Sequence, residues 1–510
     1  MKSLSIVKNF FFFIIIISIP FLDFFSYNLG NLDERTDLAV NSLTLLRLLI
    51  LFLIFLIIGL FVIIILQKTL KLKNFDANLL TGSFIFIFFQ YSNFKNILIE
   101  VFEFLEKKIN ISTYYNSVLE YNGEVSLLIL LLISYLVFKV ISKKLLFIKY
   151  LLTFYFIFNS LFFTYEIITK YKFKYKNTNK ELVTENLKFD KKNGKNIYFF
   201  ILDAMPPLEV ADKFFNSNSD IFVNRLKDKG YEYIPNTQTI YGSTFLTIGS
   251  MFNMNKVKFN NNGMPEKKGI AFPGVMKKEN LSNLEYNLKE LNYEIKWVGS
   301  HFANCQGYNK EYCIKNENKE NILFSYESLR FLKKTPIKPI ITKLLLAFGG
   351  GGFEEKIIFN SNNAMNVFIE HLDINGKPNG STFFLIHHLI SHWPYLVDSS
   401  CSFKKHVGRD NMTGIQDAYT CNKKLISKII DKINKIDKEA IVVFQSDHNW
   451  ELSNINPNKY TKRNRIFNLI KINDECKKYL GKEIDNINAV RLSLFCANNT
   501  KPILLELSEN

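Results

Sequence analysis

The chain reads Lys438-Glu-Ala-Ile-Val-Val-Phe-Gln-Ser-Asp447-His448-Asn-Trp450 near its C-terminus, an apolar, strand-like run that ends in two side chains able to bind a metal ion. In open α/β sheets, ligands bind outside the carboxyl ends of the strands. Asp447 and His448 offer one oxygen and one nitrogen to a divalent cation there. For this pair alone, a turn carboxylate beside a surface imidazole is the simpler explanation, so the interpretation depends on three further segments.

Two of these segments are also apolar runs that end in polar side chains. Asn196-Ile-Tyr-Phe-Phe-Ile-Leu-Asp203 ends in a carboxylate and is soon followed by two prolines, which predicts a buried strand that stops there. Phe383-Phe-Leu-Ile-His-His-Leu-Ile-Ser-His392 runs into three histidines and then a proline. A lone buried histidine is usually structural, but a cluster of three at a strand end favours a functional site.

The third segment is Tyr241-Gly-Ser-Thr-Phe-Leu-Thr-Ile-Gly-Ser-Met-Phe-Asn253, in which a Gly-Ser-Thr step precedes residues that can open a helix. A hydroxyl at that position faces the positive end of the helix dipole, where anions are stabilised. The alternative is that Ser243 or Thr244 only caps the helix, a role that serine and threonine often fill.

In this order, the four segments resemble the alkaline phosphatase and sulfatase superfamily, and within it the membrane-anchored branch of phosphoethanolamine transferases and lipoteichoic acid synthases. The resemblance covers about residues 195–500. It implies an α/β domain with a mostly parallel central sheet, helices on both faces and the site residues along one edge of the sheet.

The resemblance also implies a catalytic divalent metal, Zn or Mn with Mg compatible. The family's ligands map onto Asp203, Thr244, Asp447 and His448. Thr244 is implied as the nucleophile, because the segment that it begins is similar to the family's threonine-initiated helix ending in Met-Phe. His388 and His392 are implied as contacts of the substrate phosphate or of a second metal. The first ligand is Asp203, where several transferases of this branch have glutamate.

The reaction class follows from what is missing after Asp203. No Cys/Ser-x-Pro-x-Arg segment follows it, which argues against formylglycine chemistry and sulfate ester hydrolysis. A threonine alkoxide can instead attack phosphorus and carry the group. The resemblance therefore implies a metal-dependent transferase that moves phosphoethanolamine or phosphoglycerol from a membrane lipid to an envelope glycan or lipid through a phospho-threonine. A phosphate or sulfate ester hydrolase of the same fold and a scaffold without turnover are the alternatives.

The N-terminal third has a different composition. Five Phe-, Ile- and Leu-rich runs are near the roughly 20 residues that span a bilayer, at residues 7–29, 45–66, about 76–93, 125–142 and 145–166. The first run resembles a cleaved signal peptide, but it lacks a small-residue cleavage site and four more runs follow. We expect a five-span domain at 1–168, an interfacial linker at 169–194 and an extracytoplasmic catalytic domain at 195–510.

The positions of the basic residues along the sequence support a multi-pass protein of the bacterial inner (plasma) membrane. Lysines flank the first two runs and the junction of the last two, which places those loops in the cytoplasm and the C-terminal part in the periplasm or on the cell surface. The formal net charge is +17. Lys170-Tyr-Lys-Phe-Lys-Tyr-Lys176 alternates aromatic and basic residues, which suits a bilayer surface. We therefore expect the basic residues to contact the bilayer and not a nucleic acid.

Cysteine usage agrees with this topology. All six cysteines lie beyond residue 304, in the part assigned to the outside, which indicates disulfides in an oxidising compartment. Six cysteines allow 15 pairings, and a cysteine metal site is the alternative, although no Cys-x2-Cys spacing is present. Local pairing closes short loops and looks like the extra bridges of the transferase branch; it joins Cys305 to Cys313, Cys401 to Cys421 and Cys476 to Cys496.

Overall fold

The structure is a computed structural model of the whole chain. It describes residues 42–69, 153–158, 187–189, 194–215, 219–257, 281–299, 312–314, 353–405, 412–450, 464–481 and 484–506, together with residues 14, 15, 18, 19, 22, 71, 77, 80, 81, 84, 85, 132, 135, 139, 160, 161, 164, 165, 217 and 259. These described residues fall into two compact units, one in the N-terminal part and one that holds the sheet.

A six-stranded sheet organises the second unit. Its strands are β1 (Ile197–Leu202), β2 (Glu232–Tyr233), β3 (Glu294–Val298), β4 (Thr382–His388), β5 (Ile441–Gln445) and β6 (Asn468–Lys471), in the spatial order β2-β6-β5-β1-β4-β3. β1, β3, β4 and β5 are mutually parallel, and β6 runs antiparallel to β5 and β2. The predicted mostly parallel sheet is confirmed, and the carboxyl ends of its four parallel strands meet at one edge.

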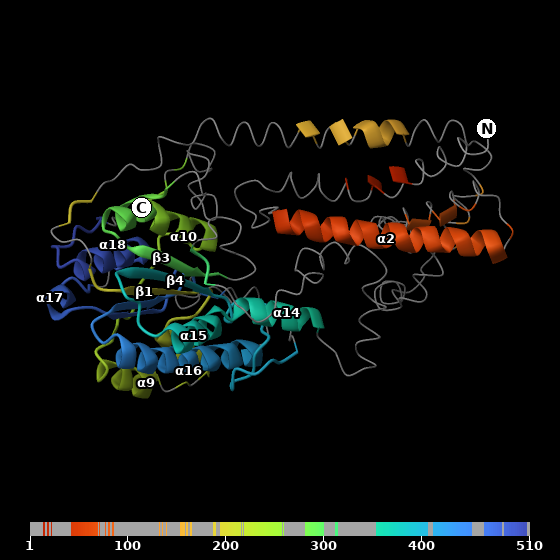
Figure 1. Cartoon of the computed structure of the whole chain (residues 1–510). Helices are drawn as coiled ribbons and strands as arrows, with labels where there is room; N and C mark the ends of the chain where they lie inside the picture. The colour runs from red at the N-terminus through yellow and green to blue at the C-terminus, as the bar shows by residue number, and fades with distance from the viewer. Residues whose placement is uncertain are drawn as a thin grey trace. The chain divides into compact units, whose positions relative to one another are not determined.

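Helices cover both faces of this sheet (Figure 1). The first face packs against α10 (Thr244–Asn253), α11 (Asn283–Glu290) and α18 (Asn486–Ala497), and the second against α8 (Leu208–Phe215), α9 (Ser219–Lys227), α15 (Ala364–Asn375) and α16 (Met412–Ile436). Burial on both faces explains why β1 and the first four residues of β5 are apolar. The remaining helices of this part are α14 (Phe353–Asn362) and α17 (Asp474–Lys477).

Strand alternation assigns each residue of β1 and β4 to one face. Ile201 pairs with His387, and Leu202 pairs with His388. Ile201 belongs to the core on the α10 and α18 side, whereas Leu202 belongs to the core on the α15 and α16 side. Since successive side chains point to opposite faces, His387 and His388 point to opposite sides of the sheet.

The N-terminal unit contains one described helix that is long and apolar enough to cross a bilayer. It is α2 (Ser42–Thr69), and the candidate span within it is Phe52–Thr69, judged by length and composition. The second predicted span falls on this helix. The other four fall mostly outside the described residues, although the described residues within them, such as 153–158, are helical. The five-span topology and the domain boundaries stay predictions.

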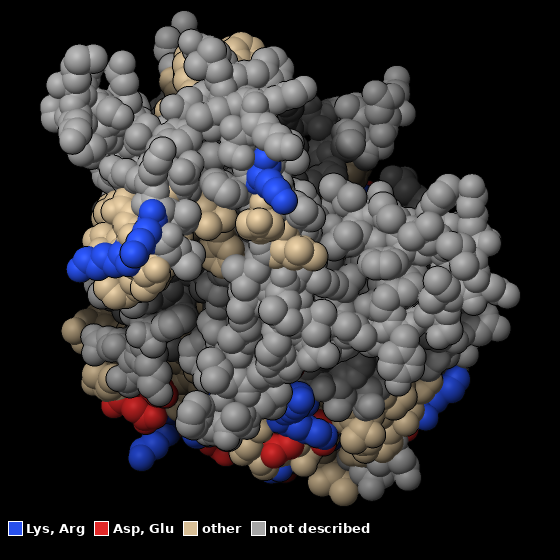
Figure 2. All heavy atoms as spheres, turned by 90° about the vertical axis from the view of Figure 1, so that its right-hand side faces the viewer, with Lys and Arg blue, Asp and Glu red and all other residues tan. Residues whose placement is uncertain are grey.

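Charged side chains of both signs occur on the molecular face in Figure 2. Along its lower edge, described Asp and Glu side chains lie beside Lys and Arg side chains. The described part of that edge therefore carries mixed charge, in spite of the formal net charge of +17 for the whole chain.

Two of the three predicted disulfides are confirmed. Cys401 is bonded to Cys421, and Cys476 is bonded to Cys496. Cys313 is also disulfide-bonded, but its predicted partner Cys305 lies outside the described residues. The first bridge attaches the loop after β4 to α16, and the second joins α17 to α18.

Candidate metal centre

The site lies where β1, β4 and β5 end side by side. Asp203 directly follows β1, and its backbone N–H donates to the carbonyl of His388 on β4. Ala204 then takes a left-handed conformation with φ of 57°, which is uncommon outside glycine. This turn directs the Ala204 N–H to Oδ1 of Asp447 at 3.2 Å. The Asp447 carboxylate is thereby held beside Asp203 through the backbone of the next residue.

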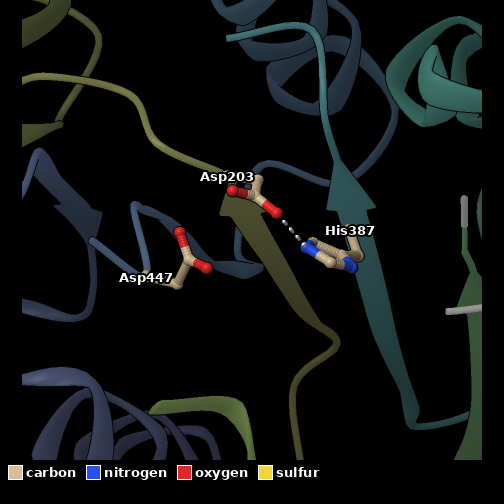
Figure 3. Close-up of side chains that lie close together, drawn as sticks. All are labelled: Asp203, His387 and Asp447. Atoms are coloured by element: carbon tan, nitrogen blue, oxygen red, sulfur yellow. Dashed lines mark ion pairs between the residues drawn. The ribbon is translucent and has the colours of Figure 1, made fainter. Parts of the chain in front are cut away.

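Asp203, His387 and Asp447 form a buried group suited to a metal ion. One potential ligand atom from each lies within 4.8 Å of the others. Figure 3 shows the Asp203 carboxylate and the His387 ring pointing toward one another, with Asp447 beside them on the loop after β5. His387 Nε2 is 3.3 Å from Asp203 Oδ2. All three side chains are 2% exposed or less, so bulk water does not screen their charges.

His448 joins this group to Thr244. Its Nε2 lies 3.2 Å from Thr244 Oγ1, 3.5 Å from Asp203 Oδ1 and 3.7 Å from Asp447 Oδ2. Its Nδ1 is 2.7 Å from the carbonyl oxygen of Asn449. Because a carbonyl can only accept, Nδ1 carries the proton in the neutral ring, and Nε2 presents a lone pair to the site.

The arrangement fits a divalent cation. The lone pair of His448 Nε2 faces two carboxylates, and such groups repel one another unless a positive charge lies among them. Asp203 Oδ1 and Asp447 Oδ2 are also buried without a hydrogen-bond partner, although buried polar atoms are nearly always satisfied. Two carboxylates and imidazole nitrogens are a common ligand set for Zn or Mn.

The charge state of Asp203 also fits a cation site. Burial opposes ionisation of this carboxyl, but nearby His392 and the hydrogen bond from His387 outweigh it and hold its pKa below the ordinary value. An ionised, buried carboxylate results, which is the form that binds a metal.

Thr244 is placed at the start of α10. Ser243 is the N-cap residue, yet its side chain makes no capping hydrogen bond, and Thr244 is the first helical residue. The Thr244 hydroxyl therefore lies at the positive end of the helix, as well as beside His448. Thr247, one turn later, holds the helix in place, because its hydroxyl lies 2.8 Å from the Tyr241 carbonyl and 3.2 Å from the Asp447 carbonyl.

Comparison with known proteins identifies the family. The model of the family described as Sulfatase matches residues 216–473, which is half of the chain. The chain belongs to the sulfatase family. The match includes Thr244, His387, Asp447 and His448, and it begins after Asp203. Among curated protein sequences, none matches the chain.

Several solved structures of this fold are similar to the chain. The periplasmic domain of EptC from Escherichia coli, in complex with Zn, is 12% identical, with 61% of this chain and 84% of that chain covered and a TM-score of 0.39. Lipooligosaccharide phosphoethanolamine transferase A from Neisseria meningitidis is 15% identical, with 76% and 72% covered and a TM-score of 0.38. Lipoteichoic acid synthase LtaP from Listeria monocytogenes is 11% identical, with 63% and 77% covered and a TM-score of 0.36.

Within this sulfatase-family site, the structure brings together Asp203, Thr244, Asp447 and His448, the four residues that the sequence assigned to the metal. It does not bring in the side chain of His388. That ring is fully buried on the other face of β4, where Nδ1 accepts from the backbone N–H of Met365 and Nε2 lies 3.0 Å from Asn422 Oδ1. His392 is exposed in the loop after β4 and contributes to the lowered pKa of Asp203.

His387 is the site residue that sequence reasoning missed. The histidine cluster predicts a site contact at His388, and the structure places His387 there instead. Two adjacent histidines on a strand point to opposite faces, so one of them faces the site and the other faces away. Only the pairing of Ile201 with His387 decides between them, because it places His387 on the same face as Asp203.

Proposed function

We propose that the protein is a divalent-metal-dependent transferase that moves a phospho-alcohol group, phosphoethanolamine or phosphoglycerol, from a membrane lipid to an envelope glycan or lipid. The observation that carries the proposal is the Thr244 hydroxyl, which begins α10 and lies 3.2 Å from the nitrogen of His448 that faces two buried carboxylates. A nucleophilic oxygen beside a cation site at a helix N-terminus is suited to attack on phosphorus.

Asp203, Asp447, His448 and Thr244 would hold the metal. Bound there, a divalent cation lowers the pKa of the threonine hydroxyl and neutralises negative charge on the phosphoryl oxygens. The Asp447 carboxylate keeps its ligand geometry because the Ala204 N–H and the His448 N–H both donate to its Oδ1, at 3.2 and 2.9 Å. Such backbone donors orient the ligand before the substrate arrives.

The transfer has two halves. The Thr244 hydroxyl gives up its proton, its oxygen attacks the phosphorus of the donor lipid to form an Oγ1–P bond, and the bond from phosphorus to the lipid's glycerol oxygen breaks. The glycerol oxygen takes up a proton and leaves as diacylglycerol. A hydroxyl of the acceptor then gives up its proton and attacks the phospho-threonine, the Oγ1–P bond breaks, and the Thr244 oxygen takes up a proton. His387 lies beside Asp203 on β4 and would bind the metal with it, and His392, in the loop after β4, would contact the phosphoryl oxygens.

The location of the reaction is part of the proposal. The apolar α2 helix and the other four apolar runs would anchor the chain in a bacterial inner membrane, with residues 195–510 in the periplasm or on the cell surface. The Cys401–Cys421 and Cys476–Cys496 disulfides of this part agree with an oxidising compartment. This placement gives Thr244 access to lipid headgroups and envelope acceptors.

The test is mass spectrometry of envelope lipids and glycans from cells that express the protein or its Thr244→Ala variant. The proposal predicts a phospho-alcohol added to an acceptor, together with new diacylglycerol, only with the active protein. Ser243→Ala is the matched control and should retain most of the product, because Ser243 makes no capping bond. Release of free phospho-alcohol without a modified acceptor would indicate a hydrolase. Identical profiles with and without Thr244 would indicate a scaffold.

A further inference from the structure

His388 is a fully buried histidine that the proposed reaction does not use. It lies at the end of β4, on the face covered by α15 and α16. Its Nδ1 lies 3.2 Å from the backbone nitrogen of Met365, in the first turn of α15. Its Nε2 lies 3.0 Å from Oδ1 of Asn422 on α16. The ring therefore joins the end of one strand to two helices.

The direction of these hydrogen bonds is fixed by the backbone. An N–H group can only donate, so Nδ1 of His388 accepts from Met365 and the ring proton is on Nε2. Nε2 then donates to Asn422 Oδ1, and the Asn422 amide nitrogen donates to the hydroxyl oxygen of Ser391. His388 and Asn422 are 0% exposed and Ser391 is 6% exposed, so water cannot replace these bonds at low cost.

Ser391 directly precedes His392 in the loop after β4, and this loop starts beside Asp203, whose backbone N–H donates to the His388 carbonyl at 2.9 Å. The chain makes a turn between the end of β4 and His392, and the His392 N–H closes this turn by donating to the Leu389 carbonyl at 3.0 Å. The far end of the same segment is also attached to α16, since Cys401 is bonded to Cys421, the residue beside Asn422. Segment 389–401 is thus attached to one turn of α16 at both ends.

From this arrangement we infer that His388, Asn422 and Ser391 are positioning residues that hold the His392 segment against the metal centre. The inference rests on the proposed function for the role of His392 in turnover. The three side chains contact neither substrate nor metal. They act through His392, because the Asn422 amide fixes the residue before it.

Removal of these contacts should displace the His392 segment and leave the reacting groups unchanged. Without the Asn422 amide, Ser391 loses its buried donor, and residues 389–393 lose one of the contacts that hold them to α16. A group displaced by about 1 Å can lose about 100-fold in rate. A partial loosening of this segment should therefore lower kcat by about tenfold, while Asp203, Asp447 and His448 keep their backbone contacts and the metal.

The experiment uses the full chain in detergent, with Asn422→Leu and the milder Ser391→Ala made in the native and the His392→Ala backgrounds. The first readout is hydrogen–deuterium exchange of the peptide covering residues 389–393, which needs no activity. We expect its exchange to quicken at least threefold in both variants, while the peptide covering 441–450 and the bound metal stay unchanged. Asn434→Leu, on the same helix but bonded to the Lys229 carbonyl, is the matched control and should leave residues 389–393 unchanged.

The second readout is the kcat of the proposed transfer. Each variant should lose about tenfold in the native background and nothing further in His392→Ala, because both changes remove the same contribution. Unchanged exchange at residues 389–393 in Ser391→Ala, or equal rate losses in both backgrounds, would overturn the inference. If the unaltered protein shows no transfer at all, the proposed function fails, and the exchange result still decides whether these residues hold the segment.

Discussion

Removal of the Cys401–Cys421 bridge should lower both stability and turnover. The two cysteines are 20 residues apart, and the chain entropy released on unfolding a loop of that length corresponds to about 3 kcal/mol. For a folded unit of roughly 300 residues, this loss lowers the unfolding midpoint by about 5 °C. Cys401 also ends the segment that carries His392, so we expect kcat to fall by about tenfold.

The other bridge provides a control matched in length. Cys476 and Cys496 are also 20 residues apart, so their removal should cost the same free energy of unfolding and leave kcat unchanged well below the new midpoint. The assay compares the two double Cys→Ala variants by thermal unfolding, followed by near-ultraviolet circular dichroism, and by initial rates of transfer. Equal losses of kcat in the two variants, or no loss in either, would refute the reasoning about the His392 segment.

Three further predictions concern other residues. Burial raises the pKa of Asp485 to about 7, so its stabilising contribution is present below about 3.8 and lost as the pH rises through about 7. Asp485→Asn, which can still cap α18, should therefore raise the free energy of unfolding by about 1–3 kcal/mol near pH 8 and not near pH 4 in urea titrations. Thr244→Ala should abolish turnover in a folded protein, whereas Ser243→Ala should retain much of it; the reverse pattern in rate assays would move the nucleophile. His387→Ala should weaken divalent metal binding at least tenfold by calorimetry, and unchanged affinity would exclude it as a ligand.

The fold and the positions of Asp203, Thr244 and Asp447 could be predicted from the sequence, because they depend on short, strong patterns. The apolar runs before Asp203 and Asp447 have the length and composition of strands buried on both faces, and ligands in such sheets lie after the strands. The Gly-Ser-Thr step marks the start of α10 at Thr244. These signals are local, so tertiary contacts did not change them.

The choice of His387 over His388 and the direction of β6 could not be predicted from the sequence in the same way. A one-residue change of register moves every side chain of a strand to the other face, and the register of β4 is set by its contact with β1. The role of His388 depends on its hydrogen bonds to Met365 on α15 and Asn422 on α16, which are distant from it in the sequence. The antiparallel β6 was likewise not foreseen, because its short run carries no signal of direction.

The most direct test of the central claim is peptide mass spectrometry of the full-length protein, trapped during turnover with a phospholipid donor and a divalent metal but no acceptor. The account predicts a phospho-alcohol group on Thr244, which disappears when an acceptor is added or when Asp447 is replaced with alanine. Transfer that proceeds with no covalent adduct on Thr244, or with the adduct on Ser243, would contradict it.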